Sequence, residues 1–182
     1  MATEAIGYIG NLIKDGRKVG IFSCEDPYNT PFHRDILKQT DYVHLIPKAG
    51  GVVIPESLDL GLQAKGINAW GVFGHCGVVN GHEVCAAIKA LNNGYHKYGP
   101  DLKRHIGNLS KYYHYQQEKT LKENIAWIET QYNLLLTTLQ QKQNIFYKTV
   151  QGNIIIFGGL VENSGDGKSY KAKILFSNQK WQ

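Results

Sequence analysis

The sequence has no apolar stretch long enough to cross a lipid bilayer, and its first residues lack the basic and apolar regions of a secretory signal peptide. It contains only three cysteines, an odd number that does not form a disulfide framework. These absences predict a soluble, cytoplasmic protein with reduced thiols. Such thiols are available as metal ligands or as small buried hydrophobic side chains.

The sequence also lacks any segment in which basic residues are concentrated. The 20 lysines and arginines are scattered among 15 aspartates and glutamates, and the net charge is only +5. Nucleic-acid binding usually requires a basic patch, so we expect no nucleic-acid partner and no membrane partner. A length of 182 residues predicts a single domain, 1–182, whose core is large enough to need no covalent staple.

Apolar runs of strand length alternate with amphipathic segments in the first half of the chain. The expected strands are 18–24, 42–46 and 67–74. The expected helices are a first one through Ile6, Ile9 and Ile13 that ends at Asp15, a second from the N-cap Thr30 to about Gln39, and a third over 55–65. This alternation predicts an α/β fold with a mostly parallel central sheet flanked by helices.

The second half of the chain has a weaker pattern. Val84 to Leu91 has helical spacing, 94–120 has no firm boundary, and apolar residues from Leu121 to Leu139 recur on one face of a long helix. The last segment reads as two strands around a Gly-rich turn, a C-terminal β-hairpin. Gly167-Lys168-Ser169 is similar to the end of a phosphate-binding loop, but Glu162 replaces its first glycine, so we interpret it as the hairpin turn.

Four potential metal ligands lie close together in a chain that has only three cysteines and seven histidines. They are His75, Cys76, His82 and Cys85, between the expected strand 67–74 and the helix that follows it. The remaining cysteine, Cys24, ends the first expected strand. Ligands gather beyond the carboxyl ends of parallel strands, and thiolate and imidazole are donors that zinc favours. The sequence therefore predicts a divalent-metal site there.

Several segments resemble the β-class carbonic anhydrases. Cys24-Glu25-Asp26 resembles the start of their Cys-x-Asp-x-Arg motif, Val72 to His75 resembles the strand that carries their ligand histidine, and Cys85 to Leu91 resembles the helix that begins at their second ligand cysteine. Ile46 to Gly51 is similar to their Asn-Ala-Gly segment. The segment 123–138, with the closing hairpin, is similar to their C-terminal helix and strands, so the resemblance covers nearly the whole chain.

The resemblance implies a β-carbonic-anhydrase-like fold and a Zn²⁺ site formed by Cys24, His75 and Cys85, with Cd²⁺ or Co²⁺ able to replace zinc. It also implies reversible hydration of carbon dioxide to bicarbonate and a homodimer. Cys76 and His82 remain rival ligands. We prefer His75 because the apolar run ends directly before it, so that a rigid strand would hold the histidine in place. Each of these residues could also be an ordinary core or capping residue.

The chain departs from the β-class pattern at two points. Nine residues separate His75 from Cys85, where the β class has two, and this longer spacer is similar to that of the ζ (cadmium) class. Tyr28 stands where the motif has its arginine, which in the family holds the aspartate away from the metal.

Because the motif's arginine is absent, the assignment of the catalytic residues stays open. Asp26 is expected to orient the attacking water, with Tyr28, Arg34 or His33 in place of the family's cation. Without such a partner Asp26 could instead close the site as a fourth ligand, which would give a structural metal site without activity. Hydrolysis of a CO₂-like molecule, such as carbonyl sulfide or carbon disulfide, is a further alternative.

Overall fold

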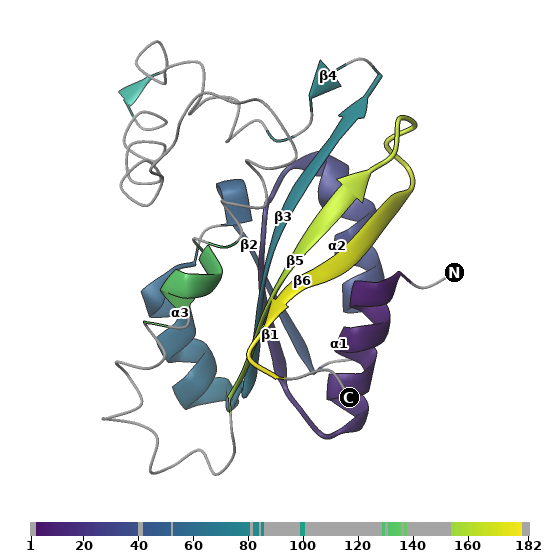
Figure 1. Cartoon of the computed structure of the whole chain (residues 1–182). Helices are drawn as coiled ribbons and strands as arrows, with labels where there is room; N and C mark the ends of the chain where they lie inside the picture. Colours follow the sequence, from purple (N-terminus) through teal and green to yellow (C-terminus); the bar gives the residue numbers. More distant parts are fainter. Residues whose placement is uncertain are drawn as a thin grey trace.

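A computed structural model of the chain describes residues 3–39, 42–51, 53–80, 82–83, 85, 99–100, 129, 131–135, 137 and 154–179. Its centre is a sheet with strand order β2-β1-β3-β5-β6, and the short β4 pairs with β3 (Figure 1). Strands β2, β1, β3 and β5 are parallel, whereas β6 runs antiparallel to β5. The strand bounds are β1 Val19–Ser23, β2 Val43–Pro47, β3 Ala69–Val79, β4 His82–Glu83, β5 Ile155–Asn163 and β6 Tyr170–Ser177. The expected mostly parallel sheet and terminal hairpin are thus confirmed.

Helices cover both faces of the sheet (Figure 1). Helices α1 (Glu4–Lys14) and α2 (Thr30–Leu37) pack on one face, and α3 (Pro55–Leu60) lies on the other, where it continues into a π-helical turn, η3 (Gly61–Lys65). Each face has its own hydrophobic core. One joins α1 and α2 to residues such as Ile21, Phe73 and Phe157, and the other joins α3 to residues such as Phe22 and Trp70.

The expected helices of the first half are present with small changes of boundary. Helix α1 ends at Lys14 and is followed by Gly16 at φ 77°, as the Asp15-Gly16 pair predicted. Gly66, at φ 63°, closes the segment 55–65 in the left-handed conformation that glycine adopts easily. Residues 129, 131–135 and 137 are helical, which agrees with the expected long helix; the rest of that helix, the helix 84–91 except Cys85, and 94–120 except 99–100 lie outside the described residues.

The expected start of the second helix was wrong by one residue. Thr30 is the first residue of α2 rather than its N-cap, and a 3₁₀ turn, η1 (Pro27–Asn29), precedes it. The side chain of Asp26 caps this turn by accepting a hydrogen bond from the backbone N–H of Tyr28. The extra turn exists because an Asp-Pro start favours a local turn before a helix.

The expected end of the third strand was also wrong. The apolar segment 67–74 suggested a strand that stops at Gly74, but β3 continues to Val79 and includes His75. Its extension pairs in parallel with β5 as far as Asn163. Gly71 acts as a packing residue, because a Cβ there would overlap with the ring of Phe157. Tertiary pairing therefore overrides the usual meaning of glycine as a strand boundary.

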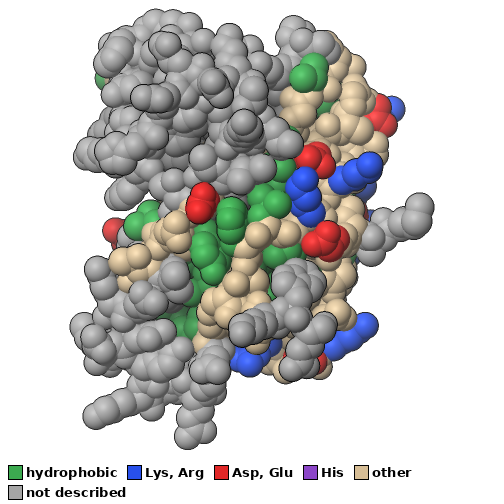
Figure 2. Space-filling model, viewed as in Figure 1, with side chains coloured by type: hydrophobic (Ala, Val, Ile, Leu, Met, Phe, Trp, Pro, Cys, Tyr) green, Lys and Arg blue, Asp and Glu red, His purple; other side chains and the backbone are tan. Residues whose placement is uncertain are grey.

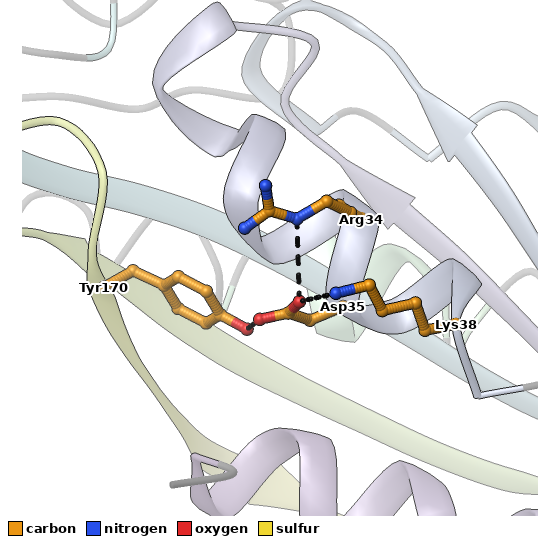
Figure 3. Close-up of polar contacts among 4 residues, drawn as sticks. All are labelled: Arg34, Asp35, Lys38 and Tyr170. Carbon is orange, nitrogen blue, oxygen red and sulfur yellow. Dashed lines mark hydrogen bonds and ion pairs between the residues drawn. The ribbon is translucent and has the colours of Figure 1, made fainter.

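Polar contacts tie α2 to the last strand (Figure 3). The Tyr170 hydroxyl of β6 donates a hydrogen bond to Asp35 Oδ2 at 2.9 Å. Asp35 Oδ1 lies 3.5 Å from Lys38 Nζ and 3.8 Å from Arg34 Nε. Burial, together with the adjacent carboxylate, raises the pKa of Tyr170, so the hydroxyl remains a donor. These contacts fix α2, which directly follows the loop after Cys24.

The face of the molecule seen in Figure 2 has hydrophobic side chains near its centre, and charged side chains of both signs are interspersed around them. Charge on this face is therefore mixed rather than of one sign. Among the described helices, none is both long enough and apolar enough to cross a membrane.

Two glycine substitutions test the packing of the sheet. A Cβ at Gly159 of β5 would overlap with the Phe73 ring and lie 2.7 Å from the Lys173 carbonyl oxygen, whereas a Cβ at Gly7 of α1 would meet nothing within 4 Å. We expect Gly159→Ala to lower the free energy of unfolding by about 1–3 kcal/mol. Gly7→Ala should raise it by about 0.5–1 kcal/mol, because alanine favours the helix. Urea denaturation measures both, and equal effects would contradict this packing.

Candidate metal site

The register between β1 and β3 places Cys24 beside His75. Ser23, the last residue of β1, pairs with Phe73 of β3, so Cys24 follows at the level of Gly74. Neighbouring strands lie about 4.8 Å apart, which brings the side chains that leave their ends within reach of one another. Both residues are buried, with exposed fractions of 2% for Cys24 and 0% for His75.

Cys85 completes a compact group with these two residues. One potential ligand atom from each of Cys24, His75 and Cys85 lies within 4.8 Å of the others, and all three residues are buried. Cys85 follows the short strand β4, which turns the chain back along β3 through the pair Val79 and His82. The structure thus brings together three side chains that are far apart in the sequence.

A glycine turn after β2 approaches Cys24 from the other side. The backbone N–H of Gly50 donates a hydrogen bond to Cys24 Sγ at 3.2 Å. Gly50 and Gly51 have φ values of 71° and 67°, and a Cβ at Gly51 would lie 2.7 Å from the Phe73 carbonyl oxygen. Glycine allows this close backbone approach, because it has no Cβ and adopts positive φ easily.

The thiol of Cys24 has a pKa well below its usual value. A hydrogen bond from Cys85 is the largest cause; burial opposes it, and the hydrogen bond and charge of His75 support it. The pKa of His75 responds in the opposite direction. Burial lowers it, but the hydrogen bond and charge of Cys24 and the charge of Asp26 outweigh burial, so the pKa is raised. The group therefore favours a thiolate, the form of cysteine that binds metals.

The two nitrogens of His75 have different surroundings. Nδ1 lies 3.2 Å from Oδ1 of Asn163, the last residue of β5. Nε2 is buried and has no hydrogen-bond partner of normal geometry. Buried polar atoms are nearly always paired, so an unpartnered ring nitrogen beside two sulfurs points to a missing ligand.

Sequence reasoning missed Asn163. Its sequence context carries little signal, because Asn163 follows Glu162 at the polar end of the expected strand, and only the structure shows that it is buried. That β5 lies next to β3 is likewise a property of the sheet order and could not be read from the segment itself.

The rival ligand Cys76 lies apart from the group. Successive residues of a strand point to opposite faces, so Cys76 leaves β3 on the face opposite to His75. Burial, helped by the charge of Glu162, raises the pKa of Cys76 to about 11, so its thiol stays protonated near neutral pH. The side chain of the other rival, His82, lies outside the described residues.

Asp26 and Tyr28 lie in the loop that follows Cys24. Asp26 Oδ1 accepts the backbone N–H of Tyr28 at 3.1 Å, and the Tyr28 carbonyl oxygen accepts a bond of 2.7 Å from Asn163 Nδ2. Tyr28 therefore contacts Asp26 through its main chain. The role considered for the Tyr28 side chain, in place of the family's arginine, stays a prediction.

Arg34 and His33 have different surroundings although they are neighbours in α2. The side chain of Arg34 is 63% exposed, and its nearest carboxylate is that of Asp35. His33 Nε2 lies 3.0 Å from Ser23 Oγ, directly before Cys24. Burial lowers the pKa of His33, and the charge of Cys24 opposes this effect, so His33 lies within the electric field of the group. The role considered for Arg34 stays a prediction.

The donor set suits a zinc ion. Two thiolates and one imidazole match its preferred ligands, and the unpartnered His75 Nε2 supplies a lone pair for it. Among the residues that the structure describes, no fourth histidine, cysteine or carboxylate joins the three. Catalytic zinc sites have three protein ligands and one open position, whereas structural sites have four.

The same fold occurs in solved structures with very different sequences. A mutant of PtLCIB4, a homolog of the limiting CO2-inducible protein LCIB, matches with a TM-score of 0.64 and 16% identity, over 97% of this chain and 88% of that chain. The β-carbonic anhydrase CcaA matches with a TM-score of 0.54 and 18% identity, over 96% and 86% of the two chains. LCIB matches with a TM-score of 0.52 and 11% identity, over 94% and 91%.

No protein-family model matches the chain, and no protein of curated function matches its sequence. The structural matches show that the chain has a β-carbonic-anhydrase-like fold, which confirms the resemblance at that level. The likeness of the spacer between His75 and Cys85 to that of the ζ class stays a prediction.

Three cysteine variants test which thiols bind a metal. We expect the wild-type protein to retain one zinc ion per chain, and Cys24→Ser and Cys85→Ser to lose it, because a serine hydroxyl is a poor ligand at neutral pH. Cys76→Ser is the matched control and should retain zinc, because its side chain points to the opposite face of β3. Elemental analysis of purified protein measures each content. Zinc loss in Cys76→Ser, with full zinc in Cys85→Ser, would contradict the assignment.

Proposed function

We propose that the chain is a zinc-dependent carbonic anhydrase, which catalyses the reversible hydration of carbon dioxide to bicarbonate and a proton. Cys24, His75 and Cys85 would hold the ion, which cadmium or cobalt could replace. The observation that carries the proposal is the buried three-donor group, with no fourth donor among the described residues, on a β-carbonic-anhydrase-like fold. The same resemblance supports a homodimer that acts on a small molecule. We propose a cytoplasmic location from the cysteine usage of the sequence alone.

The charge of the donor set determines how strongly a bound zinc ion would lower the pKa of water. Two thiolates and a neutral imidazole balance the charge of Zn²⁺, so the complex is neutral. When bound, zinc supplies a Lewis acid that lowers the pKa of a water molecule. The acidification is weaker with two thiolates than with three imidazoles, and the protein must therefore orient the water by other means.

Asp26 is the residue that would orient the water. Its carboxylate lies close enough to the group for its charge to raise the pKa of His75, against the lowering by burial. The backbone N–H of Tyr28 donates a hydrogen bond to Asp26 Oδ1. This N–H takes the place of the missing arginine as the group that restrains Asp26. A restrained carboxylate can accept a hydrogen bond from water and direct a lone pair toward carbon dioxide.

A closed structural site, the alternative, would require a different position of the Asp26 carboxylate. To become a fourth ligand, its carboxylate would have to leave the N–H of Tyr28 and join the group, to which it does not belong in the structure. Such a movement would also uncap the η1 turn. This single hydrogen bond favours the open, catalytic arrangement.

The rate of carbon dioxide hydration tests the proposal directly. Zinc-loaded wild-type protein should show stopped-flow hydration well above the buffer rate. Asp26→Asn should retain zinc but lower kcat/KM by about 10²–10⁴-fold, because an amide cannot accept the proton or orient the water equally well. A fully zinc-loaded wild-type protein without a measurable rate would establish the structural alternative instead.

A tyrosine variant separates the main chain of Tyr28 from its side chain. Tyr28→Phe removes the hydroxyl but keeps the N–H that holds Asp26 and the carbonyl that Asn163 contacts. We expect its kcat/KM to stay within about twofold of wild type, because both main-chain contacts of the residue are kept. A loss as large as that of Asp26→Asn would assign the role to the hydroxyl.

Carbonyl sulfide and carbon disulfide should be assayed beside carbon dioxide with the same preparation. Both are linear and apolar, and the donor group does not distinguish them. Faster turnover of a sulfur compound than of carbon dioxide would reassign the substrate while leaving the metal site in place.

A further inference from the structure

Asn163 makes two directed contacts at the carboxyl end of β5. It is buried, its Nδ2 donates to the Tyr28 carbonyl oxygen at 2.7 Å, and its Oδ1 lies 3.2 Å from His75 Nδ1. Asn163 pairs with Gly77, two residues beyond His75, so the asparagine and the histidine leave adjacent strands on the same face of the sheet. One side chain therefore joins three segments that surround the metal group.

The backbone is shaped for this approach. Gly77 has φ 131°, and a Cβ there would lie 2.5 Å from the Asn163 carbonyl oxygen. A larger residue would push β3 away from the end of β5. Gly77 thus lets the two strands come close where Asn163 reaches His75.

The contact with Tyr28 determines which way the amide of Asn163 points. A backbone carbonyl only accepts hydrogen bonds, so the NH₂ group must face Tyr28 and the oxygen must face His75. An amide oxygen also only accepts, so His75 Nδ1 must carry a hydrogen. In a neutral imidazole the lone pair then lies on Nε2, the buried nitrogen that has no hydrogen-bond partner of normal geometry.

We propose that Asn163 is a positioning residue that holds His75 as the Nδ1–H tautomer and so reserves the Nε2 lone pair for the metal ion. The inference rests on the proposed metal site and extends it. Ligand histidines usually donate their second N–H to a carboxylate or a backbone carbonyl, whereas here a neutral amide accepts it. An amide fixes the tautomer without a further negative charge, so the complex of two thiolates and zinc stays neutral.

The same amide also supports Asp26. Asn163 holds the carbonyl of Tyr28, and the N–H of Tyr28 holds the carboxylate of Asp26. The ligand histidine and the candidate catalytic carboxylate are thus joined through Tyr28 and one asparagine. A displaced Asn163 is expected to disturb both.

Heteronuclear NMR of protein with isotope-labelled histidine tests the tautomer. In metal-free wild-type protein, above the pH at which His75 loses its second proton, we expect hydrogen on Nδ1 and none on Nε2. Asn163→Leu, which is similar in size but cannot accept, should lose this preference. Asn163→Asp keeps an acceptor and should retain the Nδ1–H form. Hydrogen on Nε2 in the wild-type protein would overturn the proposal without any variant.

Zinc affinity, measured by competition with a chromophoric chelator, gives the second readout. We expect Asn163→Leu to weaken zinc binding by about 10–100-fold, the usual effect of removing the partner of a ligand histidine. Asn178→Leu is the matched control, because Asn178 also bridges backbone groups, Ile154 O and Ile156 N, but at the opposite end of β5. It should affect stability but neither the tautomer nor zinc affinity. An equal loss of zinc affinity in Asn163→Leu and Asn178→Leu would overturn the proposal, because Asn163 would then act only through the stability of the fold.

The test separates this inference from the proposed enzyme activity. A wild-type protein with the expected tautomer and zinc affinity, but no hydration of carbon dioxide, would remove the enzyme function and leave the role of Asn163 in place. Full activity together with an unchanged tautomer in Asn163→Leu would remove the role of Asn163 and leave the enzyme function.

Discussion

The parallel register of β1 against β3 is the constraint on which the candidate site depends. Because Ser23 pairs with Phe73, the first residue beyond β1 and a late residue of β3 come to the same level of the sheet. A shift of one residue would turn His75 to the opposite face, away from Cys24. The register is secured by the hydrophobic cores on both faces, where a slip would expose large side chains such as Phe22 and Phe73. The packing of the fold and the geometry of the donor group thus have the same cause.

Considered alone, the donor group lowers the stability of the fold. A buried imidazole nitrogen without a partner and a thiol with a lowered pKa are both arrangements that a core avoids. The protein compensates part of this cost with the N–H of Gly50 on Cys24 and the amide of Asn163 near His75. The remaining unsatisfied lone pair is what a bound cation would use. Polar groups that a core leaves unpaired are most easily understood as a binding site.

The loop after Cys24 contributes both to the fold and to the candidate site. Asp26 caps a 3₁₀ turn through the N–H of Tyr28, which fixes the start of α2. The same contact restrains the carboxylate near the donor group without an arginine. A backbone N–H provides this contact for any residue except proline, so the motif can lose its arginine and keep a restrained aspartate. The contact between Tyr170 and Asp35 stabilises the other side of α2.

Local periodicity and side-chain chemistry were enough to predict the order of strands and helices in the first half of the chain, the terminal hairpin and a set of candidate metal donors. Gly16 and Gly66 marked helix ends correctly, since a left-handed conformation is a local property. Gly74 was misleading as the end of a strand, since the pairing that extends β3 beyond it comes from β5. Only the tertiary structure decided that Cys76 faces away from the donor group and that Asn163 reaches His75. Both depend on which strands are neighbours and in what register, which no segment of the chain specifies alone.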